Sequence, residues 1–297
     1  MKMLVIGHSV VDRIKAGEKI TVKPGGIFYT SIGLLNFMDS DDEIFLLSKM
    51  DKNNYGLFEE VYRNFNLSLL EWVDKISTVE LIIHEDEERW EHYNSVPEAL
   101  NLPPDLDCKL YDGILINMIN GLDISHDDLS LIRKNFDGPV YFDVHTLSRG
   151  IGKNNHRYFR KIPESEKWFA NIDIVQANEH EILTFCGSED EKYIAEWTLN
   201  LGVGHLIVTK GSKGVVLYSP GDNGKIIKTE FEAESFNSVN KVGCGDIFGA
   251  AAFYNYLAGL DFVQSIKLAN RAAGFVTSFT EIEQFYSLKE KMDIVDD

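Results

Sequence analysis

Apolar residues along this chain gather in short runs that alternate between strand and helix character. Buried strands are predicted where two to four apolar residues stand together, at residues 2–7, 43–48, 113–117, 139–143, 172–176 and 205–209. Helical patterns separate these runs, at residues 27–37, 126–134, 191–201 and 262–279, and a further helix runs from a glycine turn at 243–246 to about residue 257. Strands alternating with helices across short connections favour an α/β fold, with a mostly parallel sheet covered by helices on both faces.

Other stretches depart from this alternation. An exposed strand or hairpin is predicted at residues 14–22 and a second hairpin at 79–93, so we expect a small β-sheet lid built from about residues 13–23 and 75–95. The remaining predictions are an amphipathic helix at 56–65, an irregular loop at 150–163, a helix start at 177–181 and antiparallel strands at 214–218 and 225–231. No repeat or linker divides the chain, which indicates a single domain over residues 1–297.

Composition restricts the class of protein. The chain has 297 residues, of which 44% are hydrophobic and 26% are charged, as in ordinary globular domains. The net charge of −18 disfavours binding to nucleic acid or to an anionic membrane surface. The densest basic cluster, Arg157, Arg160 and Lys161, is followed by Glu164 and Glu166. An anionic substrate would therefore need local cations or a metal ion.

The cysteines and the N-terminus indicate a cytoplasmic protein. Cys108, Cys186 and Cys244 are far apart and odd in number, so neither a zinc site nor a disulfide framework is expected. The first residues contain only a short apolar run, which does not resemble a signal peptide, and no stretch is long enough to span a bilayer.

The glycine turn at Gly243 and Gly245 is the most informative stretch. It opens an alanine-rich helix and carries Asp246 in the first helical turn. A glycine turn before a helix is suited to bind an anion, and a carboxylate beside it is a candidate base. The alternative is that Asp246 simply caps a core helix.

Further polar residues stand at or just after predicted strand ends, where ligands bind in open α/β sheets. They are Asp12, Asp143, Asn178, Glu181, Thr209 and Gly211, and the pair Gly25-Gly26 precedes the first helix. Several common motifs are excluded. The chain contains no Walker P-loop, no dinucleotide fingerprint after the first strand, no second histidine after His180-Glu181 to complete a zinc-protease motif, and no nucleophile elbow.

In order and spacing, this set resembles the ribokinase-like (PfkB-type) carbohydrate kinases over nearly the whole chain. The matching features are the early Asp, the Gly-Gly pair, an N-x-x-E, a T-x-G, the late G-x-G-D and Asn270 in the last helix. The resemblance implies a three-layer sandwich with a β lid, and ATP-dependent phosphoryl transfer to a hydroxyl of a sugar or sugar-like substrate.

The resemblance also implies roles for individual residues. Asp246 is the expected base, and the backbone N–H groups of Gly243, Cys244 and Gly245 form the expected anion hole. Asn178 and Glu181 are expected to act through water on Mg²⁺ bound to ATP, and a monovalent cation is left open. The nucleotide is expected at Thr209, Gly211, Gly214 and Asn270, and the substrate at Asp12, Gly25, Gly26, Thr30, Asp143 and Arg149.

Three positions depart from the family pattern. Asn240-Lys241 replace the usual Asp-Thr before the glycine turn, so Lys241 either approaches phosphate or is a surface substitution. Thr30 stands where the family commonly has Asn, and Asp143-Val-His145 replaces the frequent Asp-Pro-Asn, with Arg149 suitably placed after it. These changes bear on the substrate more than on the chemistry.

Two other functions stay open. One is a nucleoside kinase of the same fold, in which Phe28, Tyr29 or Trp90 stacks on a base. The other is a non-catalytic sugar- or nucleotide-binding protein on a kinase scaffold. A β lid also has an exposed edge that can pair with a second lid, which predicts a homodimer.

Overall fold

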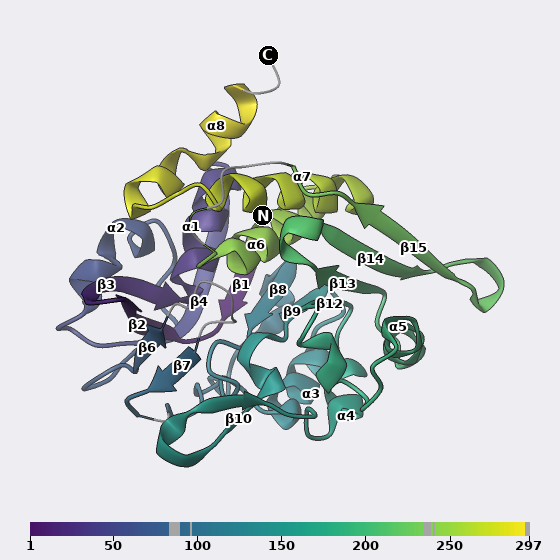
Figure 1. Ribbon diagram of the computed structural model, residues 1–297, viewed down its shortest axis with the longest axis horizontal. Helices are drawn as coiled ribbons and strands as arrows, with labels where there is room; N and C mark the ends of the chain where they lie inside the picture. Colours follow the sequence, from purple (N-terminus) through teal and green to yellow (C-terminus); the bar gives the residue numbers. More distant parts are fainter. Residues whose placement is uncertain (83–89, 96, 235–238, 240, 295–297) are drawn as a thin grey trace.

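A nine-stranded sheet forms the centre of the molecule (Figure 1). A computed structural model of the chain describes residues 1–82, 90–95, 97–234, 239 and 241–294. The strand order is β15-β14-β13-β12-β9-β8-β1-β4-β5, and all neighbours are parallel except β13–β14 and β14–β15, which are antiparallel. The strands are β1 (Lys2–Ile6), β4 (Glu43–Met50), β5 (Leu70–Trp72), β8 (Gly113–Asn117), β9 (Val140–Asp143), β12 (Ile174–Asn178), β13 (His205–Thr209), β14 (Val215–Pro220) and β15 (Ile226–Phe231).

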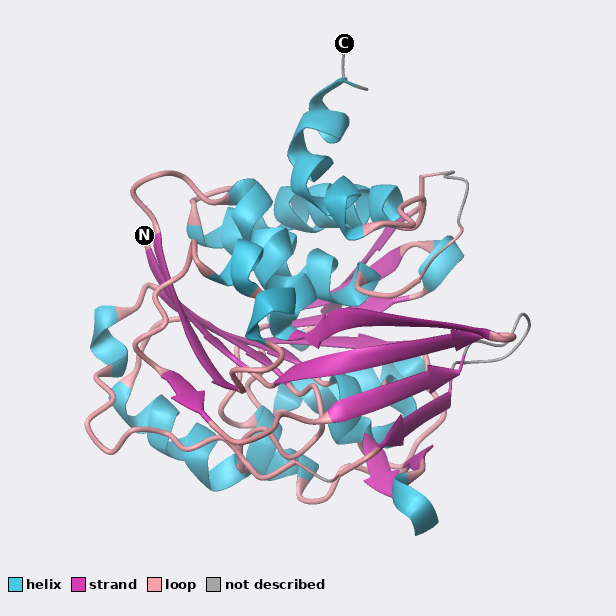
Figure 2. Ribbon diagram, turned by 90° about the vertical axis from the view of Figure 1, so that its left-hand side faces the viewer, coloured by secondary structure: helices cyan, strands magenta, loops and turns pink. Residues whose placement is uncertain are grey.

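Helices cover both faces of this sheet, which confirms the predicted fold class (Figures 1 and 2). One face carries α1 (Ile27–Phe37), α6 (Cys244–Leu257) and α7 (Phe262–Val276), and the other carries α3 (His126–Asn135), α4 (Ser165–Phe169) and α5 (Glu191–Asn200). Successive strand residues point to opposite faces, so Met3 and Val5 join the first core while Leu4 and Ile6 join the second.

The small β sheet that we call the lid has the order β3-β2-β6-β7. Its strands are β2 (Ser9–Ala16), β3 (Lys19–Gly26), β6 (Thr78–Ile82) and β7 (Trp90–Tyr93). The first hairpin is longer than the sequence pattern predicts, because Asp12 and Gly25-Gly26 lie within paired strands rather than in loops. The acidic tip of the second hairpin lies outside the described residues.

Three local predictions are wrong. The helix predicted at 56–65 is shorter and divided into two pieces, the 3-10 helix η1 (Tyr55–Leu57) and the α-helix α2 (Glu59–Tyr62). The loop predicted at 150–163 contains an antiparallel pair, β10 (Arg149–Ile151) and β11 (Arg157–Phe159). No α-helix follows residues 177–181, where the chain forms η5 (Ile182–Thr184), because the Asn178 side chain accepts the backbone N–H groups of His180 and Glu181 in a local turn.

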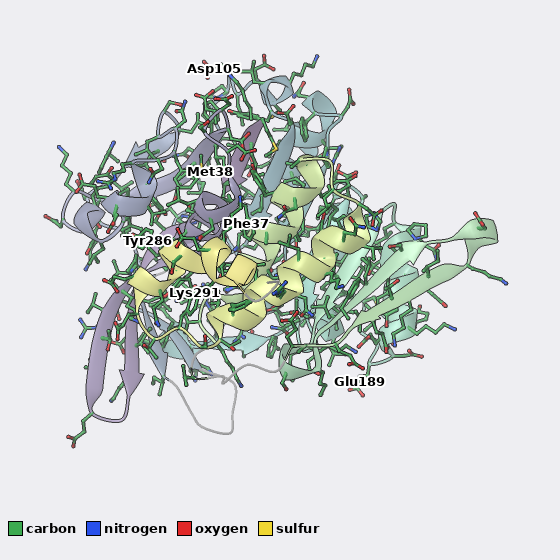
Figure 3. The ribbon with its side chains drawn as sticks, turned by 90° about the horizontal axis from the view of Figure 1, so that it is seen from above. Phe37, Met38, Asp105, Glu189, Tyr286 and Lys291 are labelled. Carbon is green, nitrogen blue, oxygen red and sulfur yellow. The ribbon has the colours of Figure 1, made fainter. Side chains whose placement is uncertain are left out.

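The C-terminal segment covers α1 from outside. Its elements are η8 (Ile282–Ser287) and α8 (Leu288–Ile294), and Asn36 of α1 donates to the Phe285 carbonyl at 2.8 Å. Figure 3 looks down onto this layer, which carries Tyr286 and Lys291. The remaining short helices are η2 (Cys108–Leu110), η3 (His145–Ser148), η4 (Lys153–Asn155), η6 (Gly211–Lys213) and η7 (Asp222–Gly224). Among the described residues, no helix has both the length and the apolar character that crossing a membrane requires.

Candidate active site

A pocket lies where the lid meets the start of α6. Asp12 and Gly26 reach it from the lid, Tyr29 from α1, and Gly243 and Asp246 from the glycine turn. Its other lining residues are Val10, Val79, Leu81, Tyr93, Ile119, His145 and Val242. Segments that are far apart in the sequence therefore meet in one concave site, and four of the predicted site residues line it.

The Gly-Gly pair makes room for the aspartate of the lid. A Cβ on Gly25 would lie 2.3 Å from the Asp12 carboxyl carbon, closer than any stable contact. Gly26 has φ +64, and a Cβ there would lie 2.1 Å from the His8 carbonyl oxygen. Only glycine suits a positive φ with so little space. The pair thus allows the buried Asp12 carboxylate to stand against the lid backbone at the pocket wall.

Gly243 is the N-terminal cap residue of α6, with φ +82 and no side-chain capping bond. A Cβ on Gly243 would lie 2.4 Å from the Tyr29 ring, so the turn depends on glycine both for its backbone angle and for its contact with α1. Because the cap is Gly243, Asp246 in the first turn of α6 does not cap the helix. The structure therefore rejects the capping alternative for this carboxylate.

Asp246 is instead held by a residue that the sequence reasoning missed. The side-chain amide of Asn117 donates to Asp246 Oδ1 at 2.7 Å and to Thr30 Oγ1 at 3.2 Å. Asn117 is the last residue of β8, so its signal in the sequence is a polar residue that ends a buried apolar strand. Thr30, expected at the substrate, is 1% exposed, does not line the pocket and contacts this amide.

Asp143 lies behind the glycine turn rather than in the pocket wall. Gln176 Nε2 donates to Asp143 Oδ2 at 3.3 Å and to the Gly245 carbonyl at 3.0 Å, which joins the end of β9 to α6. Burial raises the pKa of the Asp143 carboxyl well above its ordinary value, and the negative charges of Glu181 and Asp246 raise it further. Three carboxylates therefore influence one another at this edge of the sheet.

Asn178 and Glu181 bind each other in a reciprocal turn. Asn178 Oδ1 accepts the Glu181 backbone N–H at 2.9 Å, and Glu181 Oε2 accepts the Asn178 backbone N–H at 2.9 Å. Thr209 is paired with Asn178 across the parallel strands β12 and β13. The N-x-x-E and T-x-G motifs thus adjoin each other at the carboxyl ends of neighbouring strands.

The two glycines after Thr209 shape a tight turn. Gly211 has φ +55 and Gly214 has φ +90. A Cβ on Gly214 would clash with the Phe231 carbonyl oxygen, at a distance of only 1.9 Å. This turn leads from β13 into β14. The turn lies beside the N-x-x-E turn, where Lys213 Nζ donates to Glu179 Oε2 at 3.2 Å.

Two predicted residues are engaged elsewhere in the described structure. The Arg149 guanidinium lies over the Phe159 ring at 4.5 Å, within the β10–β11 pair. Asn270 of α7 donates to the Glu232 carbonyl at 2.8 Å. Neither lines the pocket. Over the described part of the chain, no group of three or more His, Cys, Asp or Glu side chains is arranged to hold a metal ion.

The lid and His145 contribute wall residues that the sequence analysis did not place. Tyr93 of β7 donates its hydroxyl to the Ile119 carbonyl at 3.0 Å, and the Arg157 guanidinium lies 4.4 Å from the Tyr93 ring centre. His145 has the unusual φ of 37° just after β9. The β10–β11 pair therefore packs against the lid strand that faces the pocket.

Comparisons with known proteins identify the family and the fold. Residues 154–281 match the sequence profile described as pfkB family carbohydrate kinase. The chain is 30% identical over 156 residues to an uncharacterized sugar kinase of Archaeoglobus fulgidus, a match that covers 52% of this chain and 55% of that protein. The aligned region thus spans about half the length of this curated relative.

Solved structures share the fold over almost the full chain. The aminoimidazole riboside kinase of Salmonella enterica, complexed with aminoimidazole riboside and an ATP analog, superposes with a TM-score of 0.76 at 17% identity, covering 99% of both chains. A pyrophosphate-dependent kinase in the ribokinase family, complexed with a pyrophosphate analog and myo-inositol, gives a TM-score of 0.72 at 15% identity, covering 93% of this chain and 95% of the other. At these identities the likeness concerns the fold.

Proposed function

Because this chain belongs to the ribokinase-like (PfkB-type) carbohydrate kinase family, we propose that it transfers the γ-phosphoryl group of ATP to a hydroxyl of a sugar-like substrate. The observation that carries the proposal is the pocket itself. It brings Asp12 and Gly26 of the lid to face Gly243 and Asp246 at the start of α6. An acceptor alcohol bound there would have a carboxylate and an anion-binding turn on the same side.

Asp246 is the proposed base. Phosphoryl transfer requires an aligned hydroxyl and stabilisation of charge on the transferred group, with little covalent work by the protein. The Asp246 carboxylate would accept the hydroxyl proton, while the N–H groups of Gly243, Cys244 and Gly245 would stabilise the phosphoryl oxygens. Loss of one such donor typically costs about 10²–10³ in rate.

The donor is proposed to lie over the carboxyl ends of β12 and β13. Thr209, Gly211 and Gly214 would line the nucleotide site, with Asn270 beside it. Asn178 and Glu181 would act through water on Mg²⁺ bound to the ATP phosphates, since magnesium commonly keeps most of its own waters. When bound, the ion would neutralise phosphate charge that this acidic chain otherwise opposes.

The walls of the pocket point to an uncharged acceptor. Seven of the lining side chains are aliphatic or aromatic, namely Val10, Tyr29, Val79, Leu81, Tyr93, Ile119 and Val242. Asp12 and Asp246 are the acidic members, and no Lys or Arg is among the described residues that line the pocket. A phosphate or carboxylate on the acceptor would be buried against like charge, at a high cost in free energy. Neutral sugars, cyclitols and nucleosides fit these walls.

We propose that residues 1–297 act as one kinase domain, with the lid closing over the acceptor, and that the protein acts in the cytoplasm. The lid presents Ile20 and Val22 on β3, 53% and 49% exposed, at the outer edge of its sheet. These side chains would bury against a second lid in a homodimer.

A substrate screen tests the function. Purified protein is incubated with Mg²⁺ and either ATP or pyrophosphate, and product is measured by mass spectrometry with ribose, myo-inositol and ribonucleosides as acceptors. Sugar phosphates and sugar acids serve as matched anionic acceptors. We expect ATP-dependent phosphorylation of at least one neutral acceptor and none of the anionic ones. Binding without turnover of any acceptor would favour the non-catalytic alternative, and turnover with a nucleoside alone would assign a nucleoside kinase.

A further inference from the structure

Asn117 holds the proposed base without lining the pocket. It is the last residue of β8 and is 1% exposed, whereas Asp246 lies in the pocket wall. Its two side-chain N–H groups have different partners, Asp246 Oδ1 at 2.7 Å and Thr30 Oγ1 at 3.2 Å. The amide therefore links the first turn of α6 to α1 from the end of a strand in the central sheet.

The orientation of this amide is determined by its partners. If the oxygen and nitrogen were exchanged, Asn117 Oδ1 would face the Asp246 carboxylate and two acceptors would be in contact. The 2.7 Å contact with Asp246 thus requires an N–H donor. The two helices that carry the partners are closely packed, since a Cβ on Gly33 of α1 would lie 2.9 Å from the Ala250 Cβ of α6.

The amide is not placed for stability alone. Within the part of the chain that the structure describes, the buried Asn117 Oδ1 has no hydrogen-bond partner. A buried acceptor without a partner is unfavourable and occurs where another requirement outweighs it. Here the amide is turned so that both of its N–H groups donate, to Asp246 and to Thr30, and its oxygen is left without a partner.

We infer that Asn117 is a positioning residue for phosphoryl transfer, with Thr30 orienting its amide, an inference that rests on the proposed role of Asp246. The bond from Asn117 fixes the Asp246 carboxylate through one oxygen, Oδ1, and Oδ2 is the oxygen that accepts the proton of the acceptor hydroxyl. Thr30 thereby acts behind the pocket, which gives a reason for its presence where relatives commonly carry Asn.

The test compares Asn117→Leu, Thr30→Val and the double variant. A leucine keeps the same branched heavy-atom skeleton, with a larger volume, but has no donor, so the carboxylate loses its fixed geometry. We expect kcat to fall about 10²-fold in Asn117→Leu, as for other misplaced catalytic groups. The acceptor KM should stay within about threefold, because binding contacts are retained.

Thr30→Val should lower kcat by a smaller factor in the wild-type background and have no further effect once residue 117 is Leu. This lack of additivity identifies an action through the amide, which a general loss of packing would not produce. Asn255→Leu is the matched control, since Asn255 is also on α6 and its side chain donates, among the described residues, to the Ala251 carbonyl. It should leave kcat unchanged.

Asp246→Asn in the same assay separates the two claims. If Asp246→Asn retains turnover, the proposed function is wrong. If Asp246→Asn is inactive but Asn117→Leu and Thr30→Val both retain wild-type kcat, the positioning role alone is overturned. An equal loss from Thr30→Val in both backgrounds also overturns it. If Asn117→Leu does not fold, a wild-type kcat in Thr30→Val overturns it.

Discussion

At the scale of single residues, Asp143 shows how burial and charge act on one carboxyl group. It is 5% exposed, and the neighbouring carboxylates Glu181 and Asp246 raise its pKa beyond what burial does. A group whose pKa is higher in the folded state than in the unfolded state binds its proton more tightly when folded. Its contribution to stability is therefore present at low pH and is lost as the pH rises through the folded pKa.

Asp143→Asn should stabilise the protein increasingly as the pH rises. Asparagine keeps an acceptor for Gln176 but carries no charge, so the variant avoids the burial of a carboxylate. We expect its melting temperature to exceed that of the wild type by a few degrees at about pH 8, and by less at about pH 5. Asp105→Asn, at an exposed position marked in Figure 3, should show no such trend. A difference that is constant or that shrinks with rising pH would contradict the prediction.

The sequence predicted four residues of the pocket wall, but it did not predict the residue that holds one of them, Asn117. Asp12, Gly26, Gly243 and Asp246 belong to a recognisable ordered motif set, and the fold brings them together. Asn117 could not be found in this way, because one polar residue at the end of an apolar strand is common. Its importance appears only when β8 is placed beneath α6.

At the scale of elements, hydrophobic periodicity predicted the buried strands and the long helices, since these depend on a regular pattern. It failed where short-range hydrogen bonds decide the conformation. The turn after β12 follows from the Asn178 side chain, and the β10–β11 pair depends on contact with β7, where His92 and His156 form an isolated bridge. A sequence window contains no information on such distant partners.

The glycine turn before α6 gives an element-scale prediction. Gly243→Ala forces a left-handed backbone on alanine, which costs roughly 1–2 kcal/mol, and places its Cβ 2.4 Å from the Tyr29 ring. Gly245→Ala is the matched control, because its Cβ would lie 3.6 Å from Gln176 Nε2. Urea unfolding should show a clear loss of stability for Gly243→Ala and little change for Gly245→Ala. Equal stability of the two variants would show that the turn does not depend on Gly243.

At the scale of the whole molecule, the lid is tied to the C-terminal segment and to the loop that follows β8. Lys23 of β3 donates to the Thr280 carbonyl at 2.8 Å, next to the C-terminal segment, and Tyr93 of β7 bonds to the Ile119 carbonyl. Its β3 edge remains open, with Ile20 and Val22 exposed. An apolar edge strand of this kind is prone to pair with another chain.

The lid edge therefore predicts a dimer. Light scattering after size exclusion should give about twice the chain mass of 33.7 kDa, and the Ile20→Lys/Val22→Lys variant should elute as a monomer. Ile227→Lys is the control, since Ile227 is equally exposed but lies on β15 at the far edge of the central sheet. A monomeric wild type, or a dimer that survives the double substitution, would remove the lid as the interface.

The most direct measurement is the turnover of Asp246→Asn with ATP and the acceptor found by the screen. Loss of a general base lowers kcat by about 10²–10⁴-fold, and we expect a loss in this range with the folded state retained, because Asp246 does not cap α6 and asparagine keeps an oxygen acceptor for Asn117. Asp261→Asn, at the capping position of α7, should remain fully active. Turnover of Asp246→Asn close to that of the wild type would contradict the account.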